Sequence, residues 1–178
     1  MHGFIFIEFD KFVLDHVQYT EWQQALKTND IDNSSFSPTE IYEDDKMVQM
    51  LHLAAEVTRK SPEKLLELFG AFLAPDLMKV YRAYIDPNWK TLDVLENAET
   101  TIHVAVRKST AGASPPILKV KRLSPRDVVI EYVSGRNMPE LGVGLIKGLG
   151  TYFNENLEVK LEKIPEEGKS IMTVRLMH

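Results

Sequence analysis

The apolar residues of the first 110 positions recur every three or four residues. This spacing places them on one face of a helix, and it predicts amphipathic helices over residues 5–16 and 47–57. A third helix is expected to begin at Ser61-Pro62 and to end at Gly70 or a few residues later. Serine caps a helix and proline fits its first turn, so this pair is typical of a helix start.

Two further helices and a loop complete the predicted helical part. Pro75 and Pro87 separate candidate helices over about 76–84 and 90–107, because proline interrupts helical hydrogen bonding. Residues 29–41 are rich in Asn, Asp and Ser, and this composition predicts a loop.

After Gly112 the apolar period changes to two, which is the spacing of a β-strand. The alternating segments are expected to pair as two hairpins, 117–123 with 128–133 and 157–162 with 171–176. Between them, residues 140–153 form an apolar candidate helix with four glycines, which favours close packing on a flat neighbour. The predicted fold class is α+β, an N-terminal helical part followed by an antiparallel sheet with an inserted helix.

Composition narrows the class of protein further. The 178 residues fit one domain, and the formal net charge of −5 provides no positive field for nucleic acid. The chain has no cysteine, which excludes thiolate metal sites and covalent haem attachment. No secretory signal or stretch of about 20 apolar residues is present, so we expect a cytoplasmic protein with no membrane partner.

One candidate binding motif follows the second predicted strand. In an extended segment, Tyr132, Ser134 and Arg136 would point to the same side, because alternate residues share a face. Two hydroxyls and a guanidinium suit a carboxylate ligand. The alternative is that these residues form the polar outer face of an ordinary antiparallel strand.

A second candidate is His103, on the predicted helix 90–107. The five histidines lie too far apart in sequence to form the paired ligands of a helical zinc site, so a metal centre made of protein ligands alone is not expected. The alternative is that His103 is a structural or exposed residue.

Together these motifs resemble the haem-nitric oxide/oxygen binding (H-NOX) family. His103 precedes Pro115-Pro116 by about a dozen residues, and the Y-x-S-x-R motif begins at Tyr132. In that family a haem-ligating histidine, a proline pair and this motif occur at the same spacing. Similar segments are Met1-His-Gly3, residues 65–70 and the glycine-rich residues 144–153.

The resemblance implies a single H-NOX domain over residues 1–178, with haem b between the helical part and the sheet. His103 would ligate the ferrous iron, and Pro116 would press on the porphyrin. Tyr132, Ser134 and Arg136 would bind the haem propionates. The distal side of the pocket would be lined by Ile5, Leu141 and Leu145.

The resemblance also implies a sensor rather than an enzyme. Leu141 stands where oxygen-binding members carry a tyrosine, so the chain is expected to bind NO, with CO as a further gas ligand, and to exclude O₂. Cleavage of the iron–His103 bond would change the conformation and signal to a separate histidine kinase or cyclic-di-GMP enzyme. Two alternatives remain, a haem enzyme of peroxide or nitrogen-oxide chemistry and a haem-free interaction module.

Overall fold

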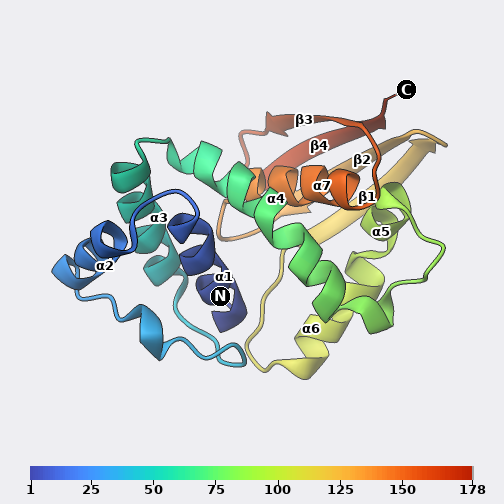
Figure 1. Cartoon of the computed structure of the whole chain (residues 1–178). Coiled ribbons are helices and arrows are strands. Elements are labelled where there is room, and N and C mark those ends of the chain that lie inside the picture. Colours follow the sequence, from blue (N-terminus) through green and yellow to red (C-terminus); the bar gives the residue numbers. More distant parts are fainter. Residues whose placement is uncertain (178) are drawn as a thin grey trace. The chain divides into compact units, whose positions relative to one another are not determined.

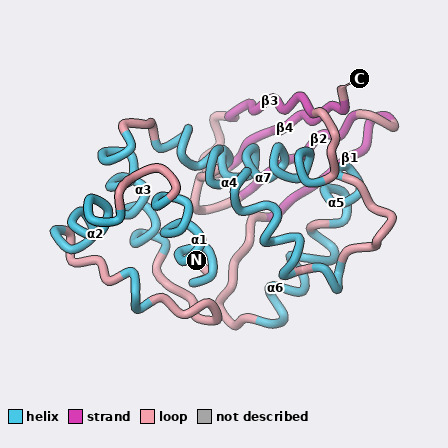
Figure 2. Tube along the Cα trace, viewed as in Figure 1, coloured by secondary structure: helices cyan, strands magenta, loops and turns pink. Residues whose placement is uncertain are grey.

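The computed structural model describes residues 1–177 and confirms the α+β class (Figures 1 and 2). The α-helices are α1 (Gly3–Leu14), α2 (Tyr19–Thr28), α3 (Asp44–Thr58), α4 (Pro62–Val80), α5 (Thr91–Asn97), α6 (Val104–Ser109) and α7 (Pro139–Tyr152). Shorter helical pieces are η1 (Asn33–Ser35), η2 (Arg82–Tyr84) and the π-helix η3 (Glu99–His103). The strands are β1 (Ile117–Ser124), β2 (Asp127–Val133), β3 (Leu157–Lys163) and β4 (Lys169–Leu176).

The chain divides into two compact units. The N-terminal unit contains residues 1–65 and 110–114, and the C-terminal unit contains residues 66–109 and those from 115 onward. The backbone therefore passes from one unit to the other at three points, within α4, after α6 and before β1. Of the predicted site residues, Ile5 belongs to the N-terminal unit and the others to the C-terminal unit.

The N-terminal unit packs around aromatic side chains of α1. Phe6, Phe9 and Phe12 are almost fully buried there, and α1 and α3 confirm the first two predicted helices. The hydrophobic pattern does not predict α2, which buries only Trp22 and Leu26. Two apolar anchors in a polar segment are too few to produce a periodic pattern. The predicted loop 29–41 is confirmed, with η1 as a short turn inside it.

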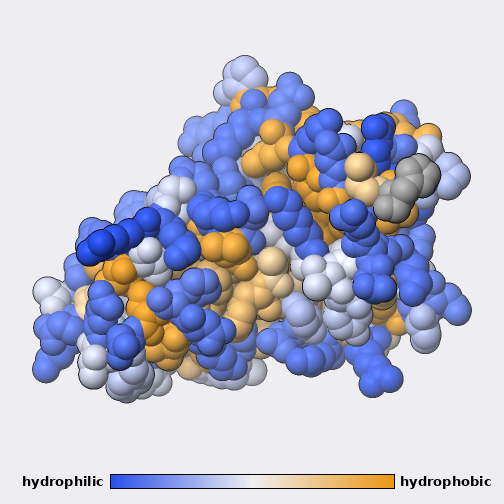
Figure 3. Space-filling view, turned by 45° about the horizontal axis from the view of Figure 1, so that its top comes forward, coloured by the Kyte–Doolittle hydropathy of each residue, from blue (hydrophilic) through white to orange (hydrophobic). Residues whose placement is uncertain are grey.

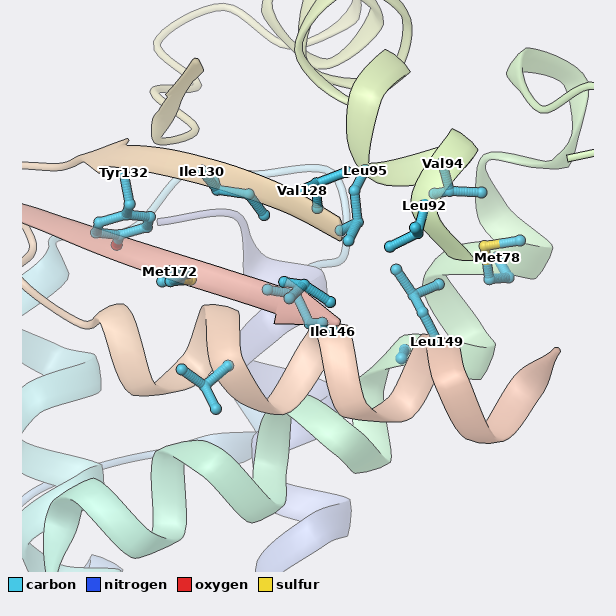
Figure 4. Packing of buried hydrophobic residues seen from close by; sticks show 13 residues of the cluster. Met78, Leu92, Val94, Leu95, Val128, Ile130, Tyr132, Ile146, Leu149 and Met172 are labelled. Carbon is cyan, nitrogen blue, oxygen red and sulfur yellow. The ribbon is translucent and has the colours of Figure 1, made fainter. Parts of the chain in front are cut away.

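In the C-terminal unit the two predicted hairpins form one sheet. Its strand order is β1-β2-β4-β3 and every neighbouring pair is antiparallel, so β2 and β4 join the hairpins and β1 and β3 lie at the edges. Helix α7 crosses one face of this sheet (Figure 1). Figure 4 shows Ile130 of β2 and Met172 of β4 facing Ile146 of α7 in the core.

The glycines of α7 allow its backbone to touch that of α4. A Cβ atom on Gly144 would lie 2.0 Å from the carbonyl oxygen of Glu67, and one on Gly70 would lie 2.3 Å from that of Leu141. The prediction of close packing is thus confirmed at these positions, but the neighbour is a helix. Gly142 does face the sheet, where its Cβ would lie 3.0 Å from the end of the Met172 side chain.

Two predicted helix boundaries are wrong. Pro75 does not end a helix, since α4 continues past it to Val80. Leu73 and Ala74 are buried beside it, and this packing offsets the single hydrogen bond that proline removes. The predicted helix 90–107 is interrupted, because η3 separates α5 from α6.

Hydrophilic residues cover most of the face shown in Figure 3, with smaller apolar areas between them. Within residues 1–177, no helix combines the length and the apolar character needed to cross a bilayer.

The contact between α4 and α7 generates a test of the fold. Gly144→Ala should lower the free energy of unfolding by about 1–3 kcal/mol, because the new methyl group must push two backbones apart. The measurement is urea denaturation of the full chain. Gly135→Ala is the control and should stay within about 0.5 kcal/mol, because its Cβ meets nothing within 4 Å. Equal stability of the two variants would contradict the backbone contact.

Candidate functional site

His103 is the last residue of the π-helix η3. Its backbone N–H donates to the carbonyl of Ala98 at 2.9 Å, five residues back, which widens the helix by one residue at this point. The imidazole is half-buried, with 16% of the side chain exposed, and its Nδ1 lies 2.9 Å from Oε2 of Glu99. The backbone of Pro116 also lies near enough to the ring to contribute to its pKa.

Two opposing effects set the charge of His103. Burial lowers the pKa of the imidazole and is the larger effect, while the hydrogen bond and charge of Glu99 raise it. The net pKa lies below its ordinary value, so the ring is neutral at pH 7. A neutral imidazole with one nitrogen held by a carboxylate is the form in which histidine binds metals.

Glu99 also belongs to this site, although the sequence pattern does not predict it. Burial alone would raise the pKa of its carboxyl group, but hydrogen bonds from His103, Leu118 and Arg107 outweigh burial and hold the pKa below its ordinary value. The spacing of four residues to His103 was the available signal. That signal is weak, because such pairs are common on exposed helices.

The Y-x-S-x-R motif spans the end of β2 and the turn after it. The strand ends at Val133, so the predicted extended continuation through Arg136 is wrong. Tyr132 is 6% exposed and packs in the sheet core, so the alternative of a polar outer face also fails for it. Its phenol is hydrogen-bonded to the Ser134 side chain and the backbone of Met138.

Ser134 is the centre of this turn. Its N–H donates to the carbonyl of Gly168 at 2.9 Å, and its hydroxyl accepts from the N–H of Arg136 at 3.2 Å. Gly168 has a φ of +73°, which favours glycine, and a Cβ there would lie 2.6 Å from the carbonyl oxygen of Ser134. Burial raises the pKa of Tyr132, while Ser134 and the positive charge of Arg136 oppose this rise.

Strand register brings the two candidate groups to the same end of the sheet. Ile117 pairs with Val133 and Leu118 pairs with Tyr132. Pro116 therefore directly precedes the end of β1 that lies beside the end of β2, where Ser134 follows. The pairing thus positions Pro116 and Ser134 at the same end of the sheet.

The three predicted distal residues are apolar and half-buried. Leu141 and Leu145 lie four residues apart on α7, and Leu145 packs against the sheet core. Ile5 lies on α1 in the N-terminal unit. Within residues 1–177, no group of three or more His, Asp or Glu side chains is arranged to hold a metal ion.

The comparisons place the chain in a haem-binding class of protein. A family model described as Haem-NO-binding matches residues 2–161, and the chain belongs to this family. No curated protein matches the chain.

Several solved structures similar to this chain are H-NOX proteins. Unliganded Fe(II) H-NOX A71G from K. algicida has a TM-score of 0.90 and 25% identity, covering 100% of this chain and 97% of that chain. The Fe(II)NO H-NOX protein from S. oneidensis has a TM-score of 0.90 and 17% identity, covering 100% of both chains. An oxygen-binding H-NOX domain related to soluble guanylate cyclases has a TM-score of 0.83 and 22% identity, covering 100% and 96%.

The buried phenol of Tyr132 yields a prediction on stability. Tyr132→Phe should lower the free energy of unfolding by about 1 kcal/mol, because the Ser134 hydroxyl and the Met138 backbone lose a partner. Denaturant unfolding checks this. Tyr152→Phe removes a hydroxyl from a side chain that is 48% exposed, and should change stability by less than about 0.5 kcal/mol. A Tyr132 variant as stable as the parent would rule out the hydrogen bonds.

Proposed function

We propose that this chain is a cytoplasmic gas sensor that binds haem b and NO, with residues 1–178 acting as one sensor domain. The observation that carries the proposal is the half-buried His103, whose Nδ1 lies 2.9 Å from Oε2 of Glu99 and whose pKa is lowered by burial. This arrangement fits a haem ligand, since Nε2 is the nitrogen that Glu99 does not engage. A ferrous haem held by one histidine supplies an open iron position for a diatomic gas.

The turn after β2 suits the haem propionates. Arg136 supplies a positive charge, and Ser134 and Tyr132 supply hydroxyls at the same end of the sheet. Carboxylates that leave water need such partners, because an unpaired buried charge is costly. Pro116 precedes β1 at this end, and its fixed ring would resist displacement by the porphyrin.

The proposed gas preference depends on side chains that cannot donate a hydrogen bond. Ile5, Leu141 and Leu145 are hydrocarbons, so bound O₂ would lack a stabilising donor, whereas NO and CO bind haem without one. We therefore propose that the chain binds NO and discriminates against O₂. Family membership alone does not imply this preference, because the similar H-NOX structures include both an NO-ligated and an oxygen-binding protein.

We propose that His103 leaves the iron when NO binds, and that its movement is the signal. Residues 110–114 directly follow α6, yet they belong to the N-terminal unit. His2 Nε2 and Thr110 Oγ1 lie 3.3 Å apart within that unit. A displacement of α6 would thus pull on the N-terminal unit through a covalent link. The receiver would be a separate histidine kinase or cyclic-di-GMP enzyme, and the chain itself would be a sensor, not an enzyme.

Absorption spectroscopy tests the gas sensor directly. The purified chain should take up haem, and NO added to the ferrous protein should shift the Soret band to that of a five-coordinate NO complex. Air should not produce an O₂ complex. A chain that stays colourless after haem supplementation would favour the haem-free interaction module, and turnover of peroxide or nitrogen oxides would favour the haem enzyme.

Substitution of His103 tests the ligand. His103→Gly should lose histidine ligation in the ferrous spectrum and regain it when free imidazole is added, because the cavity left by the ring admits this molecule. His52→Gly is the control for removing a histidine, since His52 is exposed on α3. Spectra of His103→Gly that match the parent would show that another residue binds the iron.

Substitution of Arg136 tests the propionate contact. Arg136→Ala should weaken haem affinity roughly tenfold, as expected for a hydrogen bond between charged groups. Lys121→Ala is matched in charge and lies exposed on β1, so its haem affinity should equal that of the parent. Haem transfer to apomyoglobin measures both. Equal loss in the two variants would mean that only net charge matters.

A further inference from the structure

The Glu99 carboxylate joins three parts of the C-terminal unit. Its Oε2 accepts hydrogen bonds from His103 Nδ1 at 2.9 Å and from the Leu118 backbone N–H at 3.0 Å. Its Oε1 lies 2.8 Å from Nη2 of Arg107. One side chain therefore connects the candidate haem ligand, the last turn of α6 and strand β1.

The carboxylate of Glu99 determines the tautomer and the orientation of the His103 imidazole. An ionised carboxylate can only accept hydrogen bonds, so the proton must be on Nδ1 and Nε2 keeps its lone pair. Nδ1 is also held in place, because Oε2 of Glu99 is anchored from the other side by Leu118. The ring thus has one tautomer and one orientation.

The contact with Leu118 depends on the position of β1 in the sheet. Strand β1 is an edge strand, and the outward amides of such a strand have no neighbouring strand to accept their hydrogen bonds. Glu99 accepts a hydrogen bond from one of these amides, that of Leu118, which lies two residues after Pro116. The His103 ring and the start of β1 are therefore joined through a single carboxylate.

We propose that Glu99 is a positioning residue that strengthens the bond between His103 and the haem iron and couples this ligand to the start of β1. The proposal rests on the proposed haem function. A hydrogen bond from Nδ1–H to a carboxylate increases the electron density on the ring, which makes Nε2 a stronger donor. Loss of His103 from the iron would then loosen both the ring and the Leu118 amide.

Glu99→Gln in the haem-loaded full chain tests the effect on the ligand. Glutamine keeps the size but removes the charge, so the iron–histidine stretching frequency should fall in the resonance Raman spectrum. The equilibrium between the two oxidation states should shift roughly tenfold toward the ferrous form. This corresponds to a rise in the reduction potential of about 59 mV for one electron. An unchanged frequency and potential would overturn the proposal.

Glu96→Gln is the matched control. Glu96 lies three residues before Glu99 and also binds β1, through Nε of Arg122 at 2.7 Å, whereas the carboxylate that binds His103 is that of Glu99. Its variant should leave the stretching frequency and the potential at the parent values. Equal shifts in both variants would show a general effect of charge and would also overturn the proposal.

A haem-free measurement separates this proposal from the proposed function. In the chain without haem, NMR should show the His103 proton on Nδ1, and Glu99→Gln should speed hydrogen exchange of the Leu118 amide roughly tenfold. Glu96→Gln should change neither signal. If the chain binds no haem, the proposed function fails while this result still tests the Glu99 contacts; unchanged exchange in Glu99→Gln would refute them.

Discussion

The pairing of β1 with β2 is the constraint on which the candidate site depends. Register is fixed along this hairpin because Val128, Ile130 and Tyr132 must face the core together. A slip of one residue would turn these side chains outward and separate Leu118 from Tyr132. The same pairing places Pro116 and Ser134 at one end of the sheet. The packing of the core therefore also fixes the position of these two site residues.

Burial and polarity act against each other at His103. Burial makes the charged imidazole unfavourable, while Glu99 makes it favourable, and the structure gives burial the larger effect. The outcome is a neutral ring with a directed hydrogen bond, which neither effect would produce alone. A fully exposed histidine beside Glu99 would be charged more often, and a buried one without Glu99 would have no fixed tautomer.

Elements with many apolar contacts could be predicted from the sequence. The hairpins and α7 follow from alternation and from an apolar run, because each buries one face against the same core. Helix α2 has two buried anchors and Pro75 lies within a well-packed helix, so local rules failed at both. In these cases tertiary packing decided the outcome, and no local pattern contains that information.

The candidate site likewise contains residues that the sequence predicts and residues whose role depends on tertiary contacts. The spacing of His103, Pro116 and the Y-x-S-x-R motif is a property of the sequence, and it was sufficient to indicate the family that the comparison then showed. The turn at Ser134 was not predictable, since it depends on the carbonyl of Gly168 from a distant hairpin. Glu99 was not predictable for a related reason, because its role requires an edge-strand amide at Leu118.

The three chain crossings give the proposed signal a physical route. Residues 110–114 belong to the N-terminal unit, and they lie between α6 and Pro115, which belong to the C-terminal unit. His103 is seven residues from Thr110 and Pro116 is two residues from Ser114, the two ends of this segment. Because both residues are proposed to contact the haem, a change at the haem would displace both ends of residues 110–114. The same sequence spacing that indicates the family therefore places two of its candidate haem contacts, His103 and Pro116, within seven residues of this segment in the sequence.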